Sequence, residues 1–181
     1  MSSPVTLFLL VVIPLCVGCR RSTEVDEKTA QAPASAVEGT ASPVAPPALR
    51  PHFIPVPPEL TVVEPFVQRE FAASKTAGER TLVYVGASWC EPCQSFHQAV
   101  ERGELDALLG RTRFLEFDAD RHGAMLREAG YVYGLIPVIA VPTPDGRSSG
   151  RLLSGSIKGP TAVEQNLVPR LRALLRGEPT E

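Results

Sequence analysis

The chain has 181 residues, of which 44% are hydrophobic and 21% are charged, a length and composition suited to one globular domain with additional segments. Its formal net charge is −2, and the sequence contains no basic stripe interleaved with aromatic residues. This charge pattern argues against nucleic acid as a partner. The 18 prolines crowd toward the front of the chain, which indicates that two kinds of sequence meet near residue 60.

Residues 1–19 have the pattern of a signal peptide. The apolar run over residues 5–15 is shorter than the roughly 18 to 20 residues that span a bilayer, and it is typical of a signal-peptide core. It leads into Leu15-Cys16-Val17-Gly18-Cys19, which resembles a bacterial lipoprotein signal, in which a cysteine is lipidated and becomes the mature N-terminus. We therefore predict export to a periplasm-facing or secreted location, with the membrane as a partner through lipid on Cys19.

One feature of this segment favours a different orientation. Arg20 and Arg21 follow the apolar run, and no Lys or Arg precedes it. If the segment is retained, this asymmetry favours a C-terminal side that faces the cytoplasm.

Residues 20–60 are rich in Ala, Pro, Ser, Thr and Glu and show no sustained apolar period. This composition is typical of a disordered, semi-extended tether. Such a tether would hold the domain over residues 61–177 away from a membrane surface, although an ordinary solvated linker has the same composition.

Helical and strand patterns alternate from residue 61 onward. Pro65 suits a first helical turn and Gly78 suits a helix end, so a helix is expected between them. Residues 82–85 form a short apolar run that predicts a strand. A second helix is expected from Pro92 to a break at Gly103, and a short helical turn follows over residues 105–109.

The second half of the domain continues the alternation. Residues 113–117 predict a strand, and Asp118 or Asp120 can cap a helix that Gly130 ends. A third strand is expected over residues 138–141, and an edge strand lies around residues 151–153. A last helix is expected, with Pro169 kinking or delaying it, because five apolar residues recur at helical spacing: Val163, Leu167, Leu171, Leu174 and Leu175. The predicted order is helix, strand, helix, strand, helix, strand, strand, helix.

The motif with the most chemical content is Trp89-Cys90-Glu91-Pro92-Cys93, which follows the first predicted strand. Two thiols at this spacing can form a disulfide and be reduced again. A strand that delivers Cys90 to a helix start would place its sulfur near unpaired backbone N–H groups and the positive end of the helix dipole, which favour the thiolate. Two alternatives remain open on the motif alone, a structural disulfide and half of a zinc site.

A second landmark is Tyr131-Val132-Tyr133-Gly134-Leu135-Ile136-Pro137, which precedes the third predicted strand. With both motifs in this order, residues 60–177 resemble the thioredoxin superfamily. The resemblance implies an α/β thioredoxin fold, with a central mixed sheet flanked by helices, and a cis peptide bond before Pro137. It also implies that Pro137 faces the Cys90 sulfur, where the backbone beside it can pair with an extended client segment, and that Ile136 and Pro137 help to shape the site.

The Cys90-Glu91-Pro92-Cys93 sequence is also similar to the active site of the TlpA-like group, membrane-anchored thioredoxins that serve cytochrome c maturation. Thioredoxins commonly hold a buried Asp six residues before the first cysteine, and here that position is Tyr84. Proton transfer to and from Cys93 is therefore expected to lack its usual assistant.

The resemblance implies a thiol/disulfide oxidoreductase. Cys90 would attack a client disulfide and Cys93 would resolve the mixed disulfide, with Trp89, Glu91 and Pro92 shaping the site. No cofactor besides the Cys90–Cys93 disulfide and no bound metal is expected. The expected partners are disulfide-bearing client proteins and an upstream membrane thiol donor.

Glu91 indicates the direction of the reaction. A carboxylate beside Cys90 opposes a second negative charge and raises the free-energy cost of the thiolate, whereas strong oxidants stabilise theirs. We therefore predict a reductant or a mild exchanger of disulfides.

Two alternative functions fit the same fold. Cys90, Cys93 and His97 could bind copper, as in a copper-binding chaperone, or the domain could be a redox-inert binding module. On balance His97 is expected to be an ordinary helix residue, and His122 is expected to lie on the surface near the turn over residues 118–120.

Overall fold

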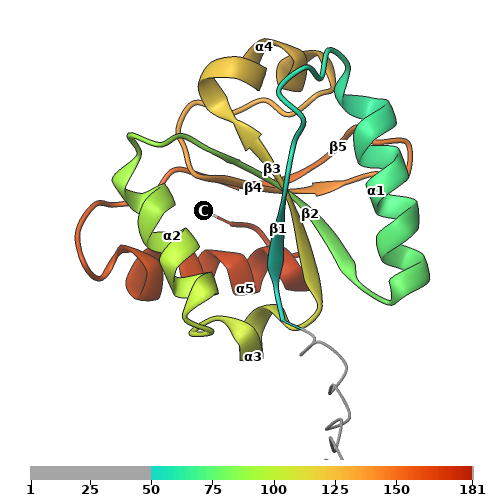
Figure 1. The fold of residues 1–181 in the computed structure, drawn as a ribbon. Helices are drawn as coiled ribbons and strands as arrows, with labels where there is room; N and C mark the ends of the chain where they lie inside the picture. Colours follow the sequence, from blue (N-terminus) through green and yellow to red (C-terminus); the bar gives the residue numbers. More distant parts are fainter. Residues whose placement is uncertain (1–49, 181) are drawn as a thin grey trace, which may run out of the picture. The chain divides into compact units, whose positions relative to one another are not determined.

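A computed structural model describes residues 50–180 of the chain. The predicted signal peptide, Cys19 and most of the predicted tether lie outside the described residues. The described part contains a five-stranded mixed sheet with helices on both faces (Figure 1). The strands are β1 (His52–Pro55), β2 (Arg80–Gly86), β3 (Thr112–Asp118), β4 (Val138–Pro142) and β5 (Ser148–Ser154).

The strand order in the sheet is β1-β3-β2-β4-β5. The pairs β1–β3 and β3–β2 are parallel, and the pairs β2–β4 and β4–β5 are antiparallel. Parallel neighbours need a crossover connection, which helices supply before and after β2, whereas a short turn suffices between β4 and β5. In this register Tyr84 of β2 lies opposite Glu116 of β3.

Two layers of helices cover the sheet. The helices are α1 (Val63–Ala77), α2 (Glu91–Glu101), α3 (Asp106–Leu109), α4 (Ala119–Glu128), the π-helical turn η1 (Ala162–Leu167) and α5 (Val168–Arg176). Apolar residues of α1 and α4 form one buried cluster, and those of α2, α3, η1 and α5 form the other. Successive residues of β2 serve opposite faces, so Leu82 and Tyr84 join the α2 and α5 side while Val83 and Val85 join the α1 side.

Local sequence signals account for several element ends. The helix predicted between Pro65 and Gly78 is confirmed as α1, and Gly78 ends it with a left-handed φ of 68°. Asp118 caps α4, because its Oδ1 accepts hydrogen bonds from the backbone N–H groups of Asp120 and Arg121, each at 2.9 Å. Gly78 thus fixes the end of α1 before β2, and Asp118 fixes the change from β3 to α4.

The predicted order is incomplete at its start, because β1 was not predicted. Its four residues lie inside the segment assigned to the tether and are bracketed by Pro51 and Pro57. β1 is an edge strand with β3 as its neighbour, and a sheet edge tolerates proline because one side of the strand needs no ladder partner. The ordered domain therefore begins before residue 61.

The C-terminal helical segment has two parts. The chain makes the π-helical turn η1 and continues as α5, with Pro169 in the first turn of α5. Proline has no N–H to donate to the preceding turn, so the regular α-helix starts beside it, as the predicted delay at Pro169 requires. Within residues 50–180, no helix combines the length and apolar character needed to cross a membrane.

Candidate active site

The two cysteines lie at the start of α2. Cys90 is the N-cap residue of this helix and Cys93 belongs to its first turn, with Pro92 between them. Their sulfur atoms form a disulfide with an S–S distance of 2.04 Å. The motif predicted to be redox-active therefore sits at a helix N-terminus, directly after the loop that follows β2.

The backbone at this helix start is directed at the Cys90 sulfur. The N–H of Cys93 donates to Cys90 Sγ at an N···S distance of 3.3 Å. The sulfur thus takes the place that a serine or aspartate oxygen takes in an ordinary N-cap. When the disulfide is reduced, this donor and the helix dipole both favour a thiolate on Cys90.

Trp89 lies at the surface beside the disulfide. Its side chain is 67% exposed, and its Nε1–H donates to Asp120 Oδ2 in the first turn of α4 at 2.8 Å. Cys90 and Cys93 are buried, at 4% and 2% exposed. The indole is therefore fixed at its polar end while its apolar surface remains available to a partner.

Glu91 makes a contact that the sequence did not indicate. Its Oε1 accepts a hydrogen bond from the backbone N–H of Gly159 at 2.9 Å. Gly159 belongs to the loop between β5 and η1, 68 residues away in the chain. Glu91 thus ties that loop to the start of α2, in addition to placing a carboxylate next to Cys90.

The segment before β4 carries the other predicted site residues. The Ile136–Pro137 peptide bond is cis, and Pro137 is buried. Ile136 packs against the buried cluster that contains Cys90 and Cys93, and the carbonyl of Pro137 accepts from the N–H of Gly155 at 2.9 Å. The approach of Pro137 to the Cys90 sulfur remains a prediction.

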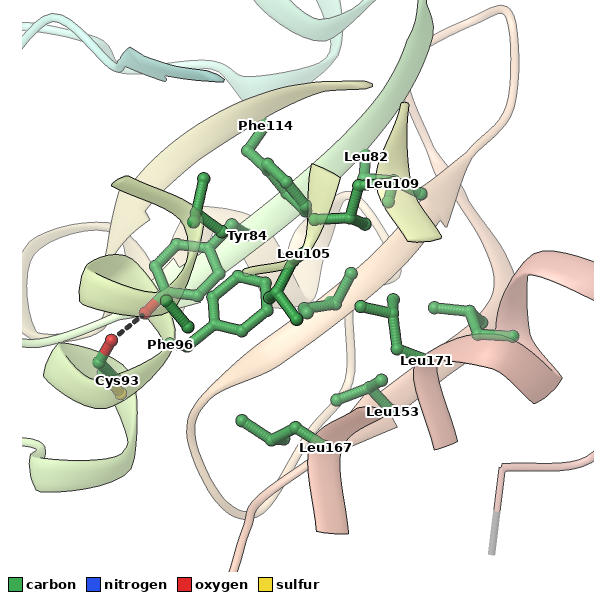
Figure 2. Close-up of a cluster of buried hydrophobic side chains, with 14 of the residues drawn as sticks. Leu82, Tyr84, Cys93, Phe96, Leu105, Leu109, Phe114, Leu153, Leu167 and Leu171 are labelled. Atoms are coloured by element: carbon green, nitrogen blue, oxygen red, sulfur yellow. Dashed lines mark hydrogen bonds between the residues drawn. The ribbon is translucent and has the colours of Figure 1, made fainter. Parts of the chain in front are cut away.

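Tyr84 occupies the position beneath the cysteines. Its hydroxyl donates to the carbonyl oxygen of Cys93 at 3.4 Å, as the dashed line in Figure 2 shows. Burial raises the pKa of Tyr84 well above its ordinary value, and the nearby charge of Glu116 raises it further. Tyr84 therefore stays protonated at neutral pH and acts as a hydrogen-bond donor, not as a base.

His97 and Glu116 form a pair that sequence reasoning did not find. His97 Nε2 lies 2.8 Å from Glu116 Oε1, and the imidazole ring stacks on Phe53 of β1 at a centroid distance of 3.8 Å. Glu116 was detectable in principle, because it is the one charged residue in the apolar run over residues 114–117. Within residues 50–180, no three His, Cys, Asp or Glu side chains are grouped as a metal site would require.

The prediction that His122 lies on the surface is wrong. His122 is only 4% exposed, because α4 directs its ring toward the protein interior. The ring lies edge-on to Phe117 at a centroid distance of 5.6 Å. The Nδ1 atom accepts from the backbone N–H of Asp118 at 3.0 Å. Burial lowers the pKa of His122, so the neutral ring carries its proton on Nε2.

A cavity of about 550 Å³ lies next to Cys93. Its wall includes Cys93, Tyr84 and His122, and Glu116 and His97 also line it. The side chains of His97 and Glu116 are 26% and 33% exposed, so both members of this pair reach solvent.

Comparisons with known proteins support no assignment beyond this geometry. No family model matches the chain, and no curated protein matches it. Three thioredoxins of known structure are similar to it: thioredoxin O1 from Arabidopsis thaliana in the oxidised state (16% identity, TM-score 0.41, covering 70% of this chain and 96% of that one), poplar thioredoxin h (20%, 0.41, 70% and 96%) and a mutant thioredoxin from Halobacterium salinarum (17%, 0.35, 60% and 80%).

The fold itself is assigned from the chain's own topology. The sheet is mixed, with β2 between β3 and β4, and helices cover both of its faces. The disulfide lies at the start of α2, after the loop that follows β2, and a cis-proline precedes β4. The described part of the chain therefore has the thioredoxin fold, with Cys90 at the N-cap of α2 and Cys93 in its first turn.

Proposed function

We propose that the protein is a thiol/disulfide oxidoreductase that reduces or exchanges disulfides of client proteins. One observation carries this proposal, the backbone N–H of Cys93 donating to Cys90 Sγ at the N-terminus of α2. A purely structural disulfide has no need of a helix start that stabilises one of its two sulfurs as a thiolate.

The reaction follows from the different positions of the two thiols. In the reduced protein the Cys90 thiolate attacks a client disulfide, forms a mixed disulfide and releases one client thiolate. Cys93 loses its proton and attacks Cys90 Sγ, which forms the Cys90–Cys93 bond and releases the second client thiolate. Two electrons pass from the dithiol to the client, and an upstream thiol donor restores the dithiol by the reverse exchange.

Exposed apolar side chains on the segments that carry the site residues support a protein client. Trp89 adjoins Cys90, and Leu135, 68% exposed, precedes the cis-proline by two residues. Ile157, 48% exposed, belongs to the loop that Glu91 holds. Such residues suit contact with an unfolded or extended polypeptide, and the backbone before β4 provides a site for strand-like pairing.

The proposed direction is reduction or mild exchange. Glu91 keeps a carboxylate beside Cys90, and its hydrogen bond with the N–H of Gly159 holds that carboxylate in place. A fixed negative charge makes the thiolate less favourable, which opposes strong oxidising power.

We expect the reduced full chain to cleave the disulfides of insulin in the presence of dithiothreitol, measured as the turbidity of the released B chain. A redox titration should give a reduction potential well below about −120 mV, the value typical of a strong oxidant. The Cys90→Ser/Cys93→Ser double variant is the control. Equal turbidity rates for the two proteins would contradict the function, and a potential near the oxidising extreme would contradict the direction.

We also propose that the protein works outside the cytoplasm, anchored through lipid on Cys19, where it could serve cytochrome c maturation as TlpA-like proteins do. The lipoprotein-like sequence around Cys19 supports the location, and the Cys90-Glu91-Pro92-Cys93 sequence supports the client class. We expect bacterial cells expressing the full chain to incorporate labelled palmitate into it, and a Cys19→Ala variant to remain unlabelled. Equal labelling of both proteins, or of neither, would contradict the anchor.

A further inference from the structure

The resolving step needs a proton acceptor for Cys93. Only the thiolate of Cys93 can attack Cys90 Sγ, and Cys93 is 2% exposed, so bulk water has little access to its thiol. The acceptor must therefore come from the side chains around Cys93 or from the cavity that adjoins it.

Four elements, β2, α2, β3 and α4, supply titratable or charged side chains to the wall of this cavity. The strand β1 contributes only an apolar residue to it. The groups are Tyr84 from β2, His97 and Glu101 from α2, Glu116 and Asp118 from β3, and Arg121 and His122 from α4.

Three of these groups are unsuited to accept the proton. Tyr84 is protonated and donates its own hydrogen to the Cys93 carbonyl. His122 uses Nδ1 as the acceptor for the Asp118 N–H and carries its proton on Nε2. Glu101 lies eight residues after Cys93, about 12 Å further along the helix axis.

Two more groups already have other roles. The Asp118 carboxylate is the N-cap of α4 and accepts two backbone N–H groups, so protonation would weaken that cap. Arg121 is a permanent cation and cannot accept a proton. Glu116 and His97 remain.

The pair and Cys93 line the same cavity, and two features of the fold bring them there. His97 follows Cys93 by four residues, one turn of α2, so both side chains lie on the same helix face. Glu116 lies opposite Tyr84 in the β2–β3 register, and the Tyr84 hydroxyl contacts the Cys93 carbonyl. The Glu116 carboxylate is held by His97 Nε2 at 2.8 Å, and Phe53 fixes the plane of the imidazole.

We propose that Glu116, positioned by His97, accepts the thiol proton of Cys93 through water in this cavity when Cys93 resolves the mixed disulfide. The inference rests on the proposed oxidoreductase function. Cys93 gives its proton to the Glu116 carboxylate, its sulfur forms the bond to Cys90 Sγ, and the client sulfur leaves as a thiolate. Glu116 then returns the proton to solvent, which it reaches because its side chain is 33% exposed.

The test separates the two chemical steps in one experiment. The full chain, carrying Cys16→Ser and Cys19→Ser so that Cys90 and Cys93 are its only thiols, is reduced and mixed with excess dithiobis(nitrobenzoate). Attack by Cys90 releases one coloured thiolate at a rate that depends on reagent concentration. Resolution by Cys93 releases the second at a rate that does not, so the two phases are distinguishable in a stopped-flow trace.

Glu116→Gln keeps the size and the hydrogen bonding of the side chain but removes its basicity. We expect it to slow the second phase by about 100-fold, the lower end of what a positioned base contributes, and to leave the first phase within about twofold. The second phase should also become steeper with pH, rising about tenfold per pH unit as hydroxide replaces the lost base. Glu101→Gln, a carboxylate change in the same cavity, should leave both phases unchanged.

His97→Gln provides the second variant, and it should slow the same phase by a smaller factor, because it loosens the acceptor without removing it. A second phase in Glu116→Gln with the wild-type rate and pH profile would overturn the proposal. Equal slowing of both phases, or an equal effect of Glu101→Gln, would also overturn it and indicate a general structural role. Absence of the first phase in the protein with native Glu116 would instead contradict the proposed function.

Discussion

A Cys93→Ser variant is expected to accumulate as mixed disulfides with client proteins, whereas a Cys90→Ser variant is expected to lose disulfide reduction and to trap nothing. The asymmetry follows from the helix start, where the N–H of Cys93 stabilises the Cys90 sulfur while Cys93 itself lies inside the first turn. Cys90 is therefore the attacking thiol, and Cys93 is the thiol that releases the client. Loss of the nucleophile should lower turnover by at least about 1,000-fold.

The measurement is non-reducing electrophoresis of cell extracts after acid quenching, with an antibody against the chain. Cys93→Ser should give bands of higher mass that disappear on reduction, and Cys90→Ser should give none of them. The Cys90→Ser/Cys93→Ser double variant is the matched control, because it retains Cys16 and Cys19. Adducts that form with Cys90→Ser but not with Cys93→Ser would reverse the assigned roles.

The sequence predicted those elements whose ends depend on neighbouring residues. Gly78 ends α1 because a glycine adopts the left-handed conformation there, and Asp118 begins α4 because its carboxylate reaches the N–H groups two and three residues later. The position of Cys90 at the start of α2 follows in the same way from an apolar strand, a loop and a proline in the first helical turn. Signals of this kind act within one or two turns of chain.

The parts that sequence reasoning missed depend on contacts between distant segments. β1 pairs with β3, which follows it by about 60 residues, and its two apolar residues, Phe53 and Ile54, lie in a proline-rich segment and form too short a run to predict a strand. Glu116 meets His97 because of the register between β2 and β3 and the face of α2 that packs above them. His122 is buried because of the direction in which α4 packs, which its position near a turn does not reveal.

Contacts between segments that are distant in the sequence also form the aromatic cluster behind the site. Phe114 lies at the centre of this cluster, among Phe53, Tyr84 and Phe96. Phe114 is fully buried, with ring centroids 5.1 Å from Phe53, 5.7 Å from Phe96 and 6.5 Å from Tyr84 (Figure 2 shows the last two). We expect Phe114→Ala to lower the free energy of unfolding by about 3 to 5 kcal/mol, the usual cost of removing a buried phenyl ring. Denaturant unfolding of the oxidised chain measures this change.

Phe71→Ala is the matched control for this change, because Phe71 is an aromatic of α1 that is only partly buried and belongs to neither buried cluster. The segments outside residues 50–180 are identical in both variants, so the difference between them reports on the domain. A loss with Phe114→Ala no larger than that with Phe71→Ala would show that the aromatic cluster does not support the fold. A loss of the expected size would show that the aromatic cluster supports the fold. The same cluster includes Tyr84, which contacts Cys93, and Phe53, which stacks on His97. A shift of the Tyr84 ring would therefore change the position of Cys93, and a shift of the Phe53 ring would change the position of His97 and of the Glu116 carboxylate that His97 holds.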